Sequence, residues 1–126
     1  MDAKELLFFN GHEASLTLYE ALTRRITAEI PDVLFKVRKT QISFYNRHMF
    51  ACVSFLPVRR SKDRPRDFLT VTFGLEYPLD SPRIDAKTEA RPDRWTHHIL
   101  LGSAEEIDEE MMGWIREAAA FSAGKR

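Results

Sequence analysis

The sequence holds a single cysteine, Cys52, and no long run of apolar residues. One cysteine cannot form a disulfide within the chain, and a chain of 126 residues buries enough surface to fold without a structural metal. No apolar run reaches the roughly 20 residues that a helix needs to cross a bilayer. Asp2, Lys4 and Glu5 do not fit an export leader. We therefore expect one cytoplasmic domain over residues 1–126, with no cofactor and no membrane association.

The chain also lacks a net charge, since 19 lysines and arginines balance 19 acids. This balance hides a segregation along the chain. Residues 1–35 have a net charge of −3, residues 36–66 of +8 and residues 67–126 of −5. Such a layout is typical either of a face that binds polyanions or of a basic sheet edge lying near an acidic helix. We favour the second interpretation, because five of the acids are clustered between residues 105 and 110.

Periodicity predicts the elements of secondary structure. Apolar residues at three- and four-residue steps indicate an amphipathic helix over residues 13–30, which Pro31 ends. β-branched and aromatic residues then predict strands over residues 33–37, 41–45, 49–56, 68–75, 83–89 and 94–101. The short polar segment 46–48 predicts a hairpin between the second and third of these strands.

The two ends of the chain carry further signals. Four adjacent apolar residues, 6–9, are expected to pack against the core as an ordered arm. Ser103 and Glu106 fit a capping box, which predicts that the last helix begins at residue 103. An apolar stripe on this helix should face the sheet; its expected members are Ile107, Met111, Trp114, Ala118 and Phe121.

Strands that are grouped between two helices, rather than alternating with them, indicate an α+β fold. The expected architecture is a mostly antiparallel sheet of five to six strands. The N-terminal and C-terminal helices should pack on one face of this sheet, which leaves a basic and aromatic face available for binding.

Several segments resemble a bacterial family known only as a domain of unknown function. The resemblance rests on residues 39–45, 50–53, 80–84, 94–98 and 103–108, and so covers nearly the whole chain. Related domains occur alone and at the ends of longer bacterial proteins, some of them labelled as predicted transport proteins. The resemblance implies no activity and supplies no catalytic residue.

A small binding site is the hypothesis that the residue types favour. Guanidinium and ammonium groups bind carboxylate or phosphate, and an aromatic wall lowers the local dielectric constant. The candidate ligand-binding residues are Lys39, Arg83, Arg94, Trp95, His97 and His98. Strand alternation places Trp95 and His97 on one face and Arg94 and His98 on the other, so the two histidines cannot chelate one metal ion together. We expect a small anionic ligand or a protein partner, and no metal.

Two other functions stay open. A basic loop would contact nucleic-acid phosphates through Arg59, Arg60, Lys62, Arg64 and Arg66, although it has no aromatic residues among its charges and no recognition helix beside it. A small hydrolytic enzyme would use His97 or His98, but no nucleophile motif accompanies them, and Cys52 lies in an apolar strand typical of a core. We assign no catalytic residue. An exposed sheet edge would also be compatible with a homodimer.

Overall fold

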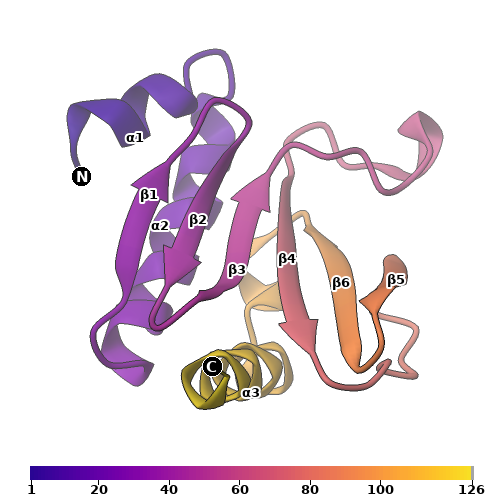
Figure 1. Cartoon of the computed structure of the whole chain (residues 1–126). Helices are drawn as coiled ribbons and strands as arrows, with labels where there is room; N and C mark the ends of the chain where they lie inside the picture. Colours follow the sequence, from indigo (N-terminus) through magenta and orange to yellow (C-terminus); the bar gives the residue numbers. More distant parts are fainter. Residues whose placement is uncertain (126) are drawn as a thin grey trace.

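The computed structural model describes residues 1–125, which form one six-stranded antiparallel sheet and three α-helices. The strands lie in the order β1-β2-β3-β4-β6-β5. Figure 1 shows α2 behind β1 and β2, and α3 below β3. The elements are α1 (Ala3–Phe8), α2 (Glu13–Glu29), β1 (Leu34–Val37), β2 (Gln41–Tyr45), β3 (Met49–Ser54), β4 (Leu69–Leu75), β5 (Ala86–Arg91), β6 (Arg94–Leu101) and α3 (Glu109–Gly124). The predicted α+β fold class is therefore confirmed.

The core lies between one face of the sheet, here called the helix-packed face, and helices α2 and α3. Val53, Val71 and Ile99 are partners across β3, β4 and β6, and all three are almost completely buried. From the helices, Leu22 and Met111 are fully buried in the same apolar cluster. Apolar side chains at alternate strand positions thus seal this face, which is the usual way that a sheet binds its helices.

The opposite face, here called the open face, has neither α2 nor α3 packed against it. Its central positions include Ser43, Cys52, Thr70, Thr72 and His98, which alternate with the core residues of the same strands. The segment after β3 folds back over one end of this face, because the Thr70 hydroxyl donates a hydrogen bond of 2.7 Å to the Leu56 carbonyl. Ser43, Cys52 and Thr70 are buried in this face, whereas Thr72 and His98 are half-buried, so solvent reaches part of it.

The N-terminal segment is helical, and only part of it joins the core. Asp2 and Glu5 form a capping box that starts α1. Phe9 is 1% exposed, whereas Leu6 is 51% and Leu7 is 72% exposed. The prediction that residues 6–9 all pack inward is thus wrong for these two leucines, because a helix points successive side chains in different directions and only one side of α1 meets the core.

The last helix begins later than the sequence predicts. The capping box of Ser103 and Glu106 is present, but it starts a single 3₁₀ turn at Ala104–Glu106. Asp108 then caps α3, accepting a hydrogen bond of 3.0 Å from the Met111 amide. The buried side of α3 also differs from the predicted stripe; its members are Met111, Met112, Ile115, Ala118, Ala119 and Ser122. Trp114 and Phe121 of the predicted stripe are half-buried.

Replacing Asp108 by Ala tests this second cap, because the carboxylate caps α3 and also pairs with Arg83 at 2.7 Å. We expect the free energy of unfolding at pH 7 to fall by about 1 kcal/mol, the usual cost of losing an N-cap, as measured by urea denaturation. Hydrogen bonding with Arg83 lowers the pKa of Asp108 below its ordinary value. Its contribution is therefore present above the ordinary carboxyl pKa and is lost as the pH falls below it.

Glu105→Ala is the matched control, because Glu105 is exposed and its side chain makes no hydrogen bond within residues 1–125. We expect this control to change the free energy of unfolding by less than about 0.5 kcal/mol. Equal losses for the two variants would contradict the capping role of Asp108.

Candidate functional site

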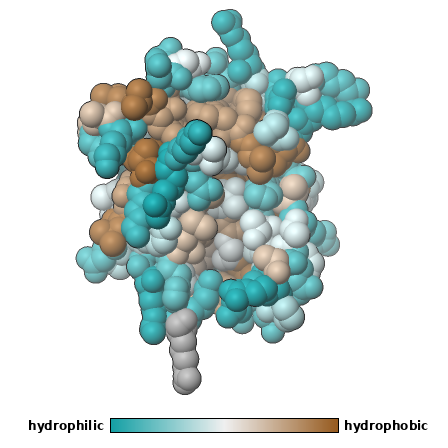
Figure 2. Space-filling view, turned by 45° about the horizontal axis from the view of Figure 1, so that its top comes forward, coloured by the Kyte–Doolittle hydropathy of each residue, from teal (hydrophilic) through white to brown (hydrophobic). Residues whose placement is uncertain are grey.

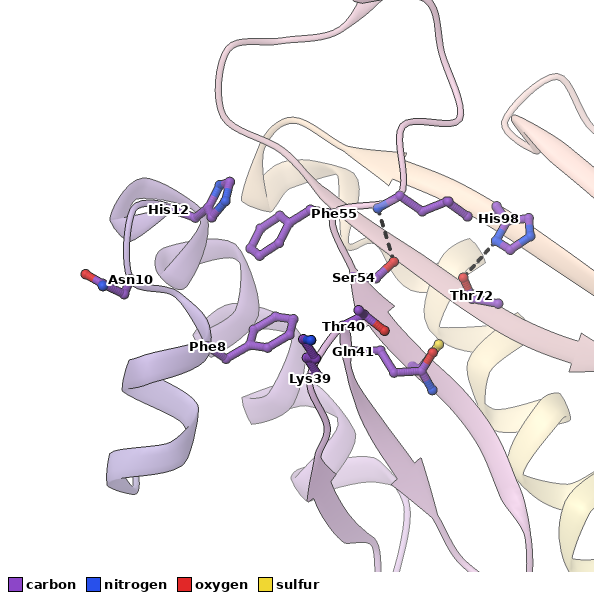
Figure 3. Close-up of a pocket in the computed structure, with 12 residues that line it drawn as sticks. Phe8, Asn10, His12, Lys39, Thr40, Gln41, Ser54, Phe55, Thr72 and His98 are labelled. Carbon is purple, nitrogen blue, oxygen red and sulfur yellow. Dashed lines mark hydrogen bonds between the residues drawn. The ribbon is translucent and has the colours of Figure 1, made fainter.

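A pocket of about 590 Å³ lies at one end of the open face, where the α1–α2 loop, the β1–β2 turn and the end of β3 meet. Figure 3 shows its two sides. Thr72 and His98 lie on the sheet, while Phe8, His12 and Phe55 lie toward the α1–α2 loop. Figure 2 brings the top of Figure 1 forward, and apolar residues are visible there between hydrophilic ones. We treat this hollow, here called the open-face pocket, as the candidate site.

The floor of the pocket is a set of polar side chains joined across neighbouring strands. The Thr72 hydroxyl and His98 Nδ1 lie 2.8 Å apart, which is hydrogen-bonding distance, because Thr72 of β4 is the register partner of His98 of β6. Cys52 of β3 is the register partner of Thr72 on its other side. The sheet register thus sets a row of three different polar groups, Cys52, Thr72 and His98, in one line.

Burial determines the ionisation of this row. It lowers the pKa of His98, because a charged imidazolium loses its hydration there. It also raises the pKa of the Cys52 thiol, and a hydrogen bond with Thr72 offsets part of that rise. At neutral pH the floor therefore presents a neutral imidazole, a hydroxyl and a protonated thiol.

The opposite wall of the pocket is aromatic. The rings of His12 and Phe55 are stacked with their centroids 4.0 Å apart, and Phe8 stacks on the other side of Phe55 at 5.4 Å. Such contacts fix the ring planes, and a flat ring presents a broad apolar surface to a ligand. The pocket thus combines an apolar wall with a hydrogen-bonding floor.

Lys39 gives the pocket its positive charge. It lies in the turn between β1 and β2 and is exposed at the mouth of the pocket. Among the described residues that line this pocket, Lys39 is the only lysine or arginine, and aspartate and glutamate do not occur. An ammonium group with no carboxylate beside it favours a ligand that carries an acid group.

The structure brings together two of the six residues predicted to form a ligand site. Lys39 and His98 both line the open-face pocket. Arg94 and Trp95 line a neighbouring hollow of about 290 Å³, which meets the pocket at Cys52 and Thr72.

The other two residues are engaged elsewhere. Arg83 donates to Asp108 at 2.7 Å and to Glu110 at 2.9 Å, beside the start of α3. His97 is buried on the helix-packed face, where its Nε2 accepts a hydrogen bond of 3.0 Å from the Leu79 amide and its ring stacks on Phe73. This acceptor role requires a neutral ring, and burial lowers the pKa of His97 accordingly.

The basic loop is partly neutralised by its own surroundings. Arg59 binds Asp85 through two nitrogens, at 2.7 and 3.3 Å, and thereby ties the loop to the start of β5. Arg60 lies 3.4 Å from Asp63. Lys62, Arg64 and Arg66 make no ion pair within the described chain. Three of the five predicted nucleic-acid contacts are therefore free of carboxylate partners.

The acids near the start of α3 make their ion pairs with arginines outside the basic segment 36–66 in the described chain. Within residues 1–125, the ion pairs of Asp108, Glu109 and Glu110 are made by Arg25, Arg83 and Arg116. Glu106, in the 3₁₀ turn before α3, is near enough to Arg59 of the basic segment for its charge to raise the pKa of that arginine. The interpretation that a basic sheet edge lies near the acidic helix therefore stays a prediction.

Sequence reasoning missed most of the pocket. The polar alternation of β4 was visible, but Thr72 becomes a candidate only once it is paired with His98, and the sequence does not give that register. Phe55 and His12 are 43 positions apart along the chain and meet only in the folded structure. Within the described residues, no three His, Cys, Asp or Glu side chains are grouped so as to hold a metal ion.

The fold and the pocket define a small α+β domain with an uncovered, polar sheet face. Residues 7–122 match the family model described as Domain of unknown function (DUF5655), and the chain belongs to this family. No curated protein and no solved structure matches the chain. Within residues 1–125, no helix is both long and apolar enough to traverse a membrane.

The ionisation of the pocket floor can be measured directly. We expect the His98 ring to titrate below the usual histidine value of about 6.5, because burial disfavours its charged form. A folded-state pKa below the unfolded one means that stability declines as the pH falls below that usual value. NMR titration of the ring protons, compared with histidine in an unstructured peptide, would test this. A midpoint at or above the peptide value would contradict the assigned environment.

Proposed function

We propose that this domain is a binding module for a small organic molecule that carries one acid group. The observation that supports this best is the composition of the open-face pocket: a single ammonium group, Lys39, at the mouth of a hollow with an aromatic wall and a neutral polar floor. A ligand acid group would pair with Lys39. Its apolar part would lie against Phe55, and its neutral polar groups would face Thr72 and His98.

The dimensions of the pocket agree with a ligand of this size. Small-molecule sites are typically clefts of about 300–1,000 Å³ with mostly apolar walls and a few placed polar groups. The pocket has about 590 Å³ and follows this pattern. A protein partner would instead need a wider surface, of about 800 Å² on each side. We therefore favour the small ligand over the protein partner.

Binding is favoured over hydrolysis by the state of the candidate nucleophiles. The Cys52 thiol is buried with a raised pKa, whereas a nucleophilic cysteine requires a thiolate. His98 Nδ1 is engaged with Thr72, and no carboxylate within residues 1–125 hydrogen-bonds to the His98 ring to orient it as a base. The hydrolytic alternative thus lacks the third group on which such sites depend.

The remaining expectations stay predictions. Arg59 and Arg60 form ion pairs with Asp85 and Asp63. This weakens the hypothesis that the loop binds nucleic acid, but three cations of the loop are still available to phosphates. A homodimer would use an edge strand, β1 or β5. Cytoplasmic location and attachment to transport proteins follow only from the sequence and its resemblance.

A screen with small aromatic carboxylic acids would test the proposed function. We expect compounds that bind to shift the backbone NMR signals of Cys52, Thr72 and His98, whose side chains form the floor. Lys39→Ala should weaken binding at least about tenfold, since a charge-assisted hydrogen bond contributes about 1.5–3 kcal/mol. Lys39 is exposed, so this variant should fold normally.

Lys62→Ala is the matched control, because Lys62 is an exposed lysine that does not line the pocket. This variant should leave the affinity unchanged. Thr72→Val keeps the shape of the floor but removes its hydroxyl, and should alter which compounds bind. If no acid shifts the floor signals, or if Lys39→Ala and Lys62→Ala have equal effects, the open-face pocket is not the binding site.

A further inference from the structure

Two arginines face each other at the tip of the β5–β6 hairpin. Arg91 and Arg94 are register partners on either side of the two-residue turn formed by Pro92 and Asp93. Like charges placed directly opposite each other on neighbouring strands destabilise the pair. Neither arginine forms an ion pair within the described residues, and Arg94 donates only to the Asp93 carbonyl, at 2.9 Å. The hairpin tip therefore holds two arginines that pair with no carboxylate in the described chain, and the acid of the turn between them, Asp93, is exposed.

A third cation reaches the same place from the end of α3. Both Arg94 and Lys125 contact the Phe121 ring: the guanidinium carbon is 4.8 Å and the ammonium nitrogen 4.6 Å from its centroid. Burial lowers the pKa of Lys125, and the charges of Arg94 and Arg91 lower it further. Because each charge raises the cost of the others, an anion bound between them would relieve a repulsion that the fold itself does not neutralise.

The three cations border a hollow of about 1030 Å³ that shares no lining residue with the open-face pocket. They also line the hollow of about 290 Å³ that lies between the two and meets the pocket at Cys52 and Thr72. His48 lines the larger hollow, and its Nε2 is buried without a hydrogen-bond partner among the described residues. One carboxylate, Glu76, is present, but it is exposed and makes no ion pair with the cations in the described chain. The hollow thus offers positive charge and a buried ring nitrogen in one place.

We propose that Arg91, Arg94 and Lys125 form a binding site for the phosphate group of a small molecule. A guanidinium binds two phosphate oxygens at once, and three cations match the charge of a phosphate better than that of a single carboxylate. The cations are gathered at one hairpin tip and one helix end rather than spread along a stripe, so they suit one compact anion. Phe121 and Pro92 provide an apolar surface for the rest of the ligand.

Inorganic pyrophosphate is the probe that tests this site. We expect saturable binding with one site per chain in isothermal titration calorimetry at constant ionic strength. Chloride should show no such binding. Arg91→Gln should weaken pyrophosphate binding at least about tenfold, the effect of losing one charge-assisted pair. The fluorescence of Trp95, next to Arg94 in β6, gives a second signal for the same event.

Arg66→Gln is the matched control, since Arg66 is an exposed arginine without an ion pair in the described residues and lies outside the hollow. It should bind pyrophosphate like the unchanged protein. Lys39→Ala should also bind it normally, which separates this site from the proposed function of the open-face pocket. The two proposals can therefore fail independently.

Stability measurements distinguish a binding site from a merely structural cluster. Arg91 is exposed and faces a like charge, so Arg91→Gln should fold at least as stably as the unchanged protein without pyrophosphate. It should then gain less thermal stability when pyrophosphate is added. Absence of saturable binding, equal binding by Arg91→Gln and Arg66→Gln, or tighter binding of a DNA oligonucleotide than of pyrophosphate would overturn the proposal.

Discussion

Two long helices cannot cover both faces of a six-stranded sheet, and much of the molecule depends on this constraint. Both helices pack on the face that carries Val53, Val71 and Ile99. The other face must then satisfy its buried and half-buried polar groups within the domain, because an unpaired buried polar group is costly. It does so through side-chain pairs such as Thr72 with His98 and through the Leu56 carbonyl, which accepts from Thr70.

The same constraint explains why the candidate ligand site lies where it does. A face without a helix remains hollow, and its polar pairs are already oriented by the strand register. Burial keeps His98 neutral there and the Cys52 thiol protonated, so the floor offers hydrogen bonds without charge. The charge comes from Lys39 in a turn, outside the sheet. Strands therefore supply the placement of the polar groups, and loops supply the charge and the aromatic wall.

Local patterns in the sequence were sufficient for the fold but not for the site. Strand alternation and helical periodicity depend on neighbouring residues, and five of the six strands lie within two residues of their predicted bounds. The predicted strand 83–89 begins instead at Ala86, because Asp85 binds Arg59 and the Leu100 amide. Arg83, in turn, is held by Asp108, which lies 25 positions further along the chain. Neighbouring residues in the sequence do not reveal which distant side chain such a residue will bind.

The charge balance takes on a different meaning in three dimensions. Arg25 and Arg116 join α2 to α3 through ion pairs with Glu29 and Glu109, so these two acids hold the helices together. In this network the charges of two arginines and two glutamates cancel. Lys39 and Arg94 take no part in this network. Lys39 lines the open-face pocket, and Arg94 lines the hollow at the tip of the β5–β6 hairpin. Within its described residues, a chain with no net charge thus still leaves cations without ion pairs along two of its hollows, while other unpaired cations, such as Lys62, lie in the exposed basic loop.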